Sequence, residues 1–273
     1  MKKLAATGIL FATLFGFLIY RNFSEHSSDV ITVNGGVTSE SQIIGNMIVQ
    51  LLEHDTDYKV KFLNNLVSAQ VNHVAMARGE LGISSVRYTG TDLVTTLGKE
   101  TIKDADQALA VVQAEKYQLS KVSDLQKHAS NLTLGVDSGW FEREGDGYQA
   151  FTEAYNMSFK KVFPMQVGLL YDALNADNFD VIVGYSTDGR ISSHGLVMLE
   201  DDRQFFPPYT CSPVVDKELY KKYPQLSSVL RKLEGKISTE TMQELNYQSD
   251  GELIEPEIVA QRFLEKHNYF EET

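Results

Sequence analysis

Residues 178–215 read NFDVIVGYSTDGRISSHGLVMLEDDRQFFPPYTCSPVV. The segment begins with a short, apolar, β-branched run, which predicts a buried strand that ends at Tyr185. The turn-forming cluster that follows closes at Gly189, where a positive φ is expected. Two prolines then fix φ and remove backbone donors, so Tyr209 lies on a stiff extended segment. Two tyrosines on rigid supports suit a preformed ligand pocket, although both are also compatible with half-buried core positions.

The N-terminal part of the chain alternates between two kinds of pattern. Residues 29–33, 58–63 and 81–86 have the apolar, β-branched character of strands, and residues 38–52 and 64–78 carry apolar residues at helical spacing. An order of strand, helix, strand, helix, strand predicts an α/β fold with a mainly parallel sheet. The chain beyond residue 215 is predicted to be helical.

Two further residues lie where such a fold presents side chains to ligands. Tyr88 follows a predicted strand and precedes a glycine turn, as Tyr185 does. Gln42 lies in the first turn of the helix after the first strand, and α/β proteins bind ligands at that edge of the sheet. The pattern alone leaves open whether Gln42 contacts a ligand or faces solvent.

Composition excludes several classes of function. The 273 residues, 42% hydrophobic and 23% charged, are enough for one or two globular domains. A net charge of −12 disfavours nucleic acid as a partner, because nucleic-acid binding needs basic patches. One cysteine and six histidines without metal-ligand spacing indicate neither a disulfide nor a metal site, and no phosphate-binding loop is present. We therefore expect no cofactor.

The sequence does not indicate an enzyme mechanism. Residues 184–189 do not form the Gly-x-Ser-x-Gly elbow of a serine hydrolase. A triad of Ser186, Asp188 and His194 would be strained because the three residues lie so close together in the sequence.

The N-terminus predicts export. Lys2 and Lys3 precede seventeen mostly apolar residues, 4–20, which is at the lower end of the length that spans a bilayer. The end of this run lacks both a cysteine and the small residues that favour cleavage, so we expect residues 1–28 to act as an uncleaved anchor, a cleaved signal being the alternative. The remaining chain is expected outside the cytoplasmic membrane.

Four motifs resemble a known family. They are GELGISSVRYTGT (79–91), GYSTDGRI (184–191), LEDDRQFFPPY (199–209) and LNYQSDGELIEPEIVAQRFL (245–264). In this order they are similar to the substrate-binding proteins of ABC importers for quaternary-amine osmoprotectants, namely glycine betaine, carnitine and choline.

The resemblance implies a two-lobed fold of the type II periplasmic-binding-protein kind with a hinge. Lobe 1 is expected to comprise residues 29–104 together with 210–273, and lobe 2 residues 105–209 with the hinge crossovers. It also implies no enzymatic activity, and as partners a permease subunit in the membrane and, through it, an ATPase.

The same resemblance assigns the ligand site. Tyr88, Tyr185 and Tyr209 are expected to form an aromatic box around a quaternary ammonium group, since such a group has no proton to donate and is bound by aromatic faces. Thr91 and Gln42 are expected to contact the carboxylate or hydroxyl at the other end of the ligand.

Departures from the family pattern leave the identity of the ligand open. Val86 and Arg87 stand where relatives commonly have tryptophan or proline followed by glutamate, and Gln107 stands where a tyrosine is common. The segment near residues 104–108 is also shorter than in relatives. Trp140, the one tryptophan, is a candidate replacement wall. A different zwitterion, such as ergothioneine, is therefore an alternative ligand.

Overall fold

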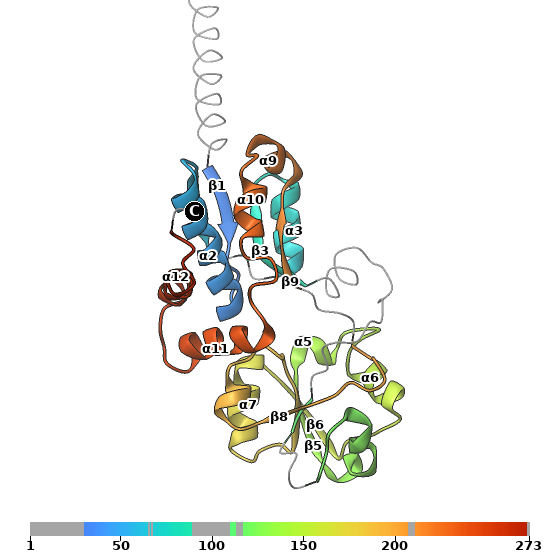
Figure 1. The fold of residues 1–273 in the computed structure, drawn as a ribbon. Helices are drawn as coiled ribbons and strands as arrows, with labels where there is room; N and C mark the ends of the chain where they lie inside the picture. Colours follow the sequence, from blue (N-terminus) through green and yellow to red (C-terminus); the bar gives the residue numbers. More distant parts are fainter. Residues whose placement is uncertain are drawn as a thin grey trace, which may run out of the picture.

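Two lobes, each built on its own β-sheet, make up the described part of the chain (Figure 1). The computed structural model describes residues 30–88 apart from 65 and 67, and residues 110–112, 117–206 and 211–271. Within them, one sheet has four strands in the order β2-β1-β3-β9 and the other has five in the order β6-β5-β7-β4-β8. The predicted α/β fold of two lobes is confirmed. The predicted lobe boundaries at residues 104 and 209 lie outside the described residues.

The first sheet is parallel apart from one edge strand. β1 (Val30–Asn34) pairs in parallel with β2 (Lys59–Leu63) on one side and with β3 (Ile83–Tyr88) on the other. β9 (Cys211–Val215) returns from lobe 2 and pairs antiparallel with β3. The strand patterns of the N-terminal part predicted the parallel strands, whereas β9 was not predicted because its side chains do not alternate between apolar and polar.

Six helices surround this sheet in the described residues. They are α2 (Ser39–Asp55), α3 (Ala69–Ala77), α9 (Lys217–Lys222), α10 (Leu226–Arg231), α11 (Thr239–Asp250) and α12 (Pro256–Lys266). Thr38 caps α2 by accepting a hydrogen bond from the backbone N–H of Ser41 at 3.3 Å, which fixes where the helix begins. The apolar face of α2, including the fully buried Met47 and Leu51, packs into the lobe 1 core. α11 lies along the side of lobe 1 that faces lobe 2 (Figure 1).

Helix α3 is shorter than the predicted helix of residues 64–78. Its buried face is not the one that the spacing of its apolar residues indicated. It begins only after Ser68, whose side chain accepts a hydrogen bond from the backbone N–H of Val71 at 3.2 Å. Asn72 is buried and accepts a hydrogen bond from the Asn34 side chain at 2.9 Å, so a polar contact orients the helix on the sheet. Val71 and Val74 are consequently exposed.

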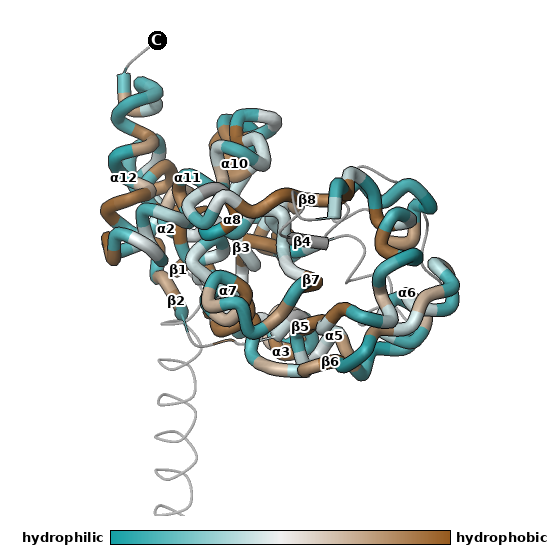
Figure 2. The backbone as a smooth tube through the Cα atoms, turned by 90° about the horizontal axis from the view of Figure 1, so that it is seen from below, coloured by the Kyte–Doolittle hydropathy of each residue, from teal (hydrophilic) through white to brown (hydrophobic). Residues whose placement is uncertain are grey.

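The second sheet is mixed. β5 (Thr133–Asp137) pairs in parallel with β6 (Lys161–Met165) and β7 (Val181–Val183), while β4 (Ala110–Val112) is antiparallel to β7 and to β8 (Val197–Leu199). Around it lie α5 (Ser138–Phe141), α6 (Tyr148–Tyr155), α7 (Val167–Asn175), α8 (Arg190–Ser193) and the 3-10 helices η3 (Val122–Lys127) and η4 (Ala129–Asn131). β7 is hydrophobic and buried within the sheet, whereas the outer turns near α6 are largely hydrophilic (Figure 2).

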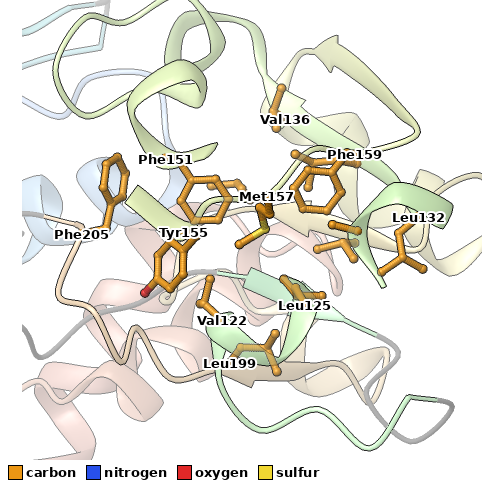
Figure 3. Packing of buried hydrophobic residues seen from close by; sticks show 14 of the residues in the cluster. Val122, Leu125, Leu132, Val136, Phe151, Tyr155, Met157, Phe159, Leu199 and Phe205 are labelled. Atoms are coloured by element: carbon orange, nitrogen blue, oxygen red, sulfur yellow. The ribbon is translucent and has the colours of Figure 1, made fainter. Parts of the chain in front are cut away.

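An aromatic cluster fills the core of lobe 2 on the α6 side of its sheet (Figure 3). Phe151 on α6 is 1% exposed, and its ring lies 5.5 Å from that of Phe205 and 5.8 Å from that of Trp140, measured between centroids. Trp140 is itself only 6% exposed. The suggestion that Trp140 replaces a wall of the ligand site is therefore wrong, because its ring is used to fill this core.

Gly189 is required for close packing and not for backbone conformation. Its φ is not positive, so that prediction is wrong. A Cβ atom at this position would lie 2.4 Å from the backbone nitrogen of Tyr247 on α11, which is closer than real Cβ atoms approach. The glycine therefore lets the loop after β7 in lobe 2 lie directly against a helix of lobe 1.

Replacing Gly189 with alanine is expected to destabilise the protein by about 1–3 kcal/mol, because the loop and α11 must separate to make room. Gly168→Ala is the matched control, since a Cβ atom there would meet nothing within 4 Å. Urea unfolding of both variants provides the measurement. Equal stabilities would show that the loop does not press on α11.

No helix in the described part of the chain is long and apolar enough to cross a membrane. The predicted anchor, residues 1–28, lies outside that part.

Candidate ligand-binding site

Tyr88 lies at the carboxyl end of β3, beside the first turn of α2. Its phenol donates a hydrogen bond of 2.6 Å to Oε1 of Glu40. Glu40 is only 6% exposed. The Gly-containing turn after β1 places the start of α2 at the same edge of the sheet as the end of β3, which brings the two side chains together.

Tyr185 lies on a loop of lobe 2 that is held tightly at its base. The phenol of Tyr171, on α7, accepts a hydrogen bond from the backbone N–H of Tyr185 at 2.7 Å and donates one to its carbonyl at 3.1 Å. A Cβ atom at Gly184 would lie 2.4 Å from that phenol oxygen, so only glycine fits there. The side chain of Tyr185 is left 49% exposed on a fixed backbone.

The loop that carries Tyr185 contacts lobe 1 directly. The hydroxyl of Thr187 donates a hydrogen bond to Oε2 of Glu40 at 2.5 Å. Two side-chain amides of α11 donate to the loop backbone, Gln243 to the carbonyl of Ser186 at 2.6 Å and Asn246 to the carbonyl of Thr187 at 2.8 Å. Glu40 is thus bonded to both lobes, and the loop of lobe 2 is held beside Tyr88.

The electrostatics of the two tyrosines agree with this arrangement. Burial raises the pKa of Tyr88 well above its ordinary value, and the carboxylate of Glu40 and the phenol of Tyr185 raise it further. Desolvation likewise raises the pKa of Tyr185, with Asp137 adding to the increase and Arg143 opposing it. Tyr185 is 49% exposed, but the buried part of the side chain is enough for desolvation to be the main cause of its raised pKa. Because the pKa of each phenol is raised above its ordinary value, both tyrosines are neutral at physiological pH.

Glu40 connects two segments that carry predicted site residues: it is hydrogen-bonded to Tyr88 and to Thr187, which follows Tyr185 by two positions. Thr91 and Tyr209 are outside the described residues. Gln42 is half-buried in the first turn of α2. It lies two residues from Glu40, about 200° around the helix axis, so the two side chains leave the helix in different directions.

Sequence reasoning missed Glu40 and Thr187. Glu40 follows a capping threonine, and an acidic residue in a first helical turn is usually explained by the helix dipole alone. Thr187 was interpreted as a turn residue. Only the tertiary contact between the lobes identifies them as parts of the site.

The catalytic triad is not formed. Both oxygens of Asp188 bind the guanidinium of Arg190, at 2.9 Å and 2.8 Å. The ring of His194 instead faces Asp172, with Nε2 3.7 Å from the nearer carboxylate oxygen. Among the described residues, no group of acidic, histidine or cysteine side chains is arranged to hold a metal ion.

Two α/β lobes that meet around tyrosines, with polar groups of one lobe bonded to the other, define the class of two-lobed solute-binding proteins. Residues 29–266 match the OpuAC family, described as the substrate binding domain of ABC-type glycine betaine transport system. The chain belongs to this family. It is the substrate-binding component of an ABC importer and not an enzyme.

Individual relatives agree with this assignment. The chain is 49% identical to the carnitine transport binding protein OpuCC of Listeria monocytogenes, over 90% of this chain and 89% of that protein. It is 33% identical to the ergothioneine transport permease/ergothioneine binding protein EgtU of Helicobacter pylori, over 92% of this chain but 49% of that protein.

A solved structure agrees as well. The crystal structure of a glycine betaine/carnitine/choline ABC transporter protein superposes with a TM-score of 0.80 at 44% identity, covering 88% of this chain and 100% of that one. The family resemblance of the four sequence motifs is confirmed.

Proposed function

We propose that the protein binds a quaternary ammonium compound, namely glycine betaine, carnitine or choline, between its two lobes and delivers it to a membrane permease driven by an ATPase. The observation that carries the proposal is that Glu40 hydrogen-bonds both Tyr88 of lobe 1 and Thr187, which lies on the lobe 2 loop that also carries Tyr185. A trimethylammonium group cannot donate hydrogen bonds, so neutral aromatic rings are its natural partners. Each ring contributes about 0.5–2 kcal/mol.

The remaining assignments complete this proposal. Tyr209 is the third wall of the aromatic box, and Thr91 and Gln42 contact the polar end of the ligand. The chain divides into lobe 1, residues 29–104 with 210–273, and lobe 2, residues 105–209. An anchor formed by residues 1–28 holds both lobes outside the cell membrane, near the permease, which raises their effective concentration there.

Calorimetric titration of the full-length chain with glycine betaine, carnitine and choline tests the proposal. Saturable binding of at least one compound, with no chemical change in it, is the expected result. A folded sample that binds none of them would refute the proposal.

Ergothioneine is the second candidate and belongs in the same titration. It is favoured by the 33% identity to an ergothioneine permease and binding protein, and by the departures at Val86, Arg87 and Gln107. Binding of ergothioneine alone would retain the class of protein and replace the ligand.

Cys211 provides a chemical probe of the site, because it lies opposite Tyr88 in the pairing of β3 with β9. The residue reaches solvent, but burial of its thiol and the charge of Glu40 raise its pKa to about 12. Only the thiolate reacts with iodoacetamide, so alkylation is expected to be slow at pH 7 and to accelerate about tenfold per pH unit up to pH 10. A saturating quaternary amine should slow it further. A rate that levels off near pH 8.5, as for an ordinary thiol, would contradict this placement.

A further inference from the structure

Glu40 is a buried anion at the junction of the lobes. Its side chain is 6% exposed, and each carboxylate oxygen accepts a hydrogen bond from a hydroxyl, Oε1 from Tyr88 in lobe 1 and Oε2 from Thr187 in lobe 2. Both oxygens of the Glu40 side chain are therefore engaged by hydroxyl groups, one from each lobe.

The position of Glu40 connects its charge to the proposed ligand site, on which this inference rests. Its bond to Tyr88 fixes one ring of the aromatic box, and its bond to Thr187 holds the loop that begins with the other ring, Tyr185. The charge of Glu40 also raises the pKa values of the Tyr88 phenol and the Cys211 thiol, so its field reaches several groups at this edge of the lobe 1 sheet.

We propose that Glu40 determines specificity by the net charge of the ligand. Glu40 favours cations that lack a carboxylate, such as choline, relative to zwitterions such as carnitine. Through its hydrogen bond to Thr187, it also holds the lobes closed over both classes of ligand. Attraction between unlike charges is strong where protein excludes water. A zwitterion brings its own anion, whose repulsion by Glu40 offsets part of the attraction felt by its ammonium group.

Glu40 has two proposed roles, selecting ligands by charge and holding the lobes together, and different variants test each role. Thr187→Val removes the bond between the lobes and leaves the charge of Glu40 in place. Glu40→Gln is nearly isosteric with the native side chain and removes only the charge, since its amide oxygen still accepts one hydroxyl bond. Tyr88→Phe removes the other bond and retains the aromatic face.

Calorimetric titration of the full-length chain with choline and with carnitine provides the test. Glu40→Gln is expected to weaken choline binding about tenfold more than carnitine binding, since the charge contribution is lost only for the net cation. Thr187→Val is expected to weaken binding of both ligands by equal factors, and Tyr88→Phe to retain most of the affinity for both. A Glu40→Asp variant, which keeps the charge, should restore most of the choline preference.

Other outcomes overturn the inference in distinguishable ways. Equal weakening of both ligands by Glu40→Gln would reduce Glu40 to a positioning residue and leave the proposed function intact. Failure of the unsubstituted protein to bind any quaternary amine would overturn the proposed function and this inference together. Should Glu40→Gln not fold, Glu40→Asn decides, because it also lacks the charge and must then weaken choline binding more than carnitine binding.

Discussion

Replacing both Tyr88 and Tyr185 with alanine is expected to weaken binding of the quaternary amine by about 5- to 700-fold. The range follows from two aromatic contacts of about 0.5–2 kcal/mol each, at about 1.4 kcal/mol for every factor of ten. Because the two rings come from different lobes, the double substitution also removes the aromatic contacts through which the ligand would connect the lobes. The measurement is titration calorimetry with whichever of glycine betaine, carnitine and choline the unsubstituted protein binds.

Two controls make this result specific. Replacing the same two residues with phenylalanine keeps both aromatic faces, so it is expected to retain most of the affinity. Tyr220→Ala removes a tyrosine on α9 that is 48% exposed, almost as much as Tyr185 at 49%, and is expected to have no effect. A double alanine variant that binds as tightly as the unsubstituted protein would show that the ammonium group does not lie between these rings.

Replacing Phe151 with alanine is expected to destabilise lobe 2 by about 3–5 kcal/mol, the usual cost of truncating a buried aromatic ring. Phe151 is 1% exposed, and its ring contacts those of Trp140, Tyr155, Phe205 and Phe206. Such contacts leave little room for the core to collapse around the missing ring. Chemical unfolding, followed by the fluorescence of Trp140, reports directly on this cluster.

Phe163→Ala is the matched control, because Phe163 is in the same lobe but 38% exposed. Its loss is expected to cost less than that of Phe151, because more than a third of Phe163 remains exposed to water in the folded protein. Equal costs for the two substitutions would contradict the placement of the core on the α6 side of the sheet.

The fold could be predicted because its main signals are local. The alternation of β-branched runs with helically spaced apolar residues predicted the parallel strands of lobe 1 and the helix α2. The positions of Tyr88 and Tyr185 in the fold could be predicted as well, since each stands where a strand ends. The class of protein followed from four long motifs that span both lobes.

The features that were missed depend on contacts between distant segments. Thr187 acts at the site because its hydroxyl reaches Glu40, 147 residues earlier in the chain. Gly189 is needed because α11 passes within contact distance of it, and the sequence around it shows only a turn. Trp140 was a candidate wall of the ligand site because it is the only tryptophan of the sequence, but its ring packs in the core of lobe 2.

A crystal structure of the protein grown with the quaternary amine that calorimetry identifies tests the central claim most directly. The ammonium nitrogen is expected within about 6 Å of the ring centroids of both Tyr88 and Tyr185, which is the range of a cation–π contact. Ligand density elsewhere, or against the ring of only one lobe, would contradict the account.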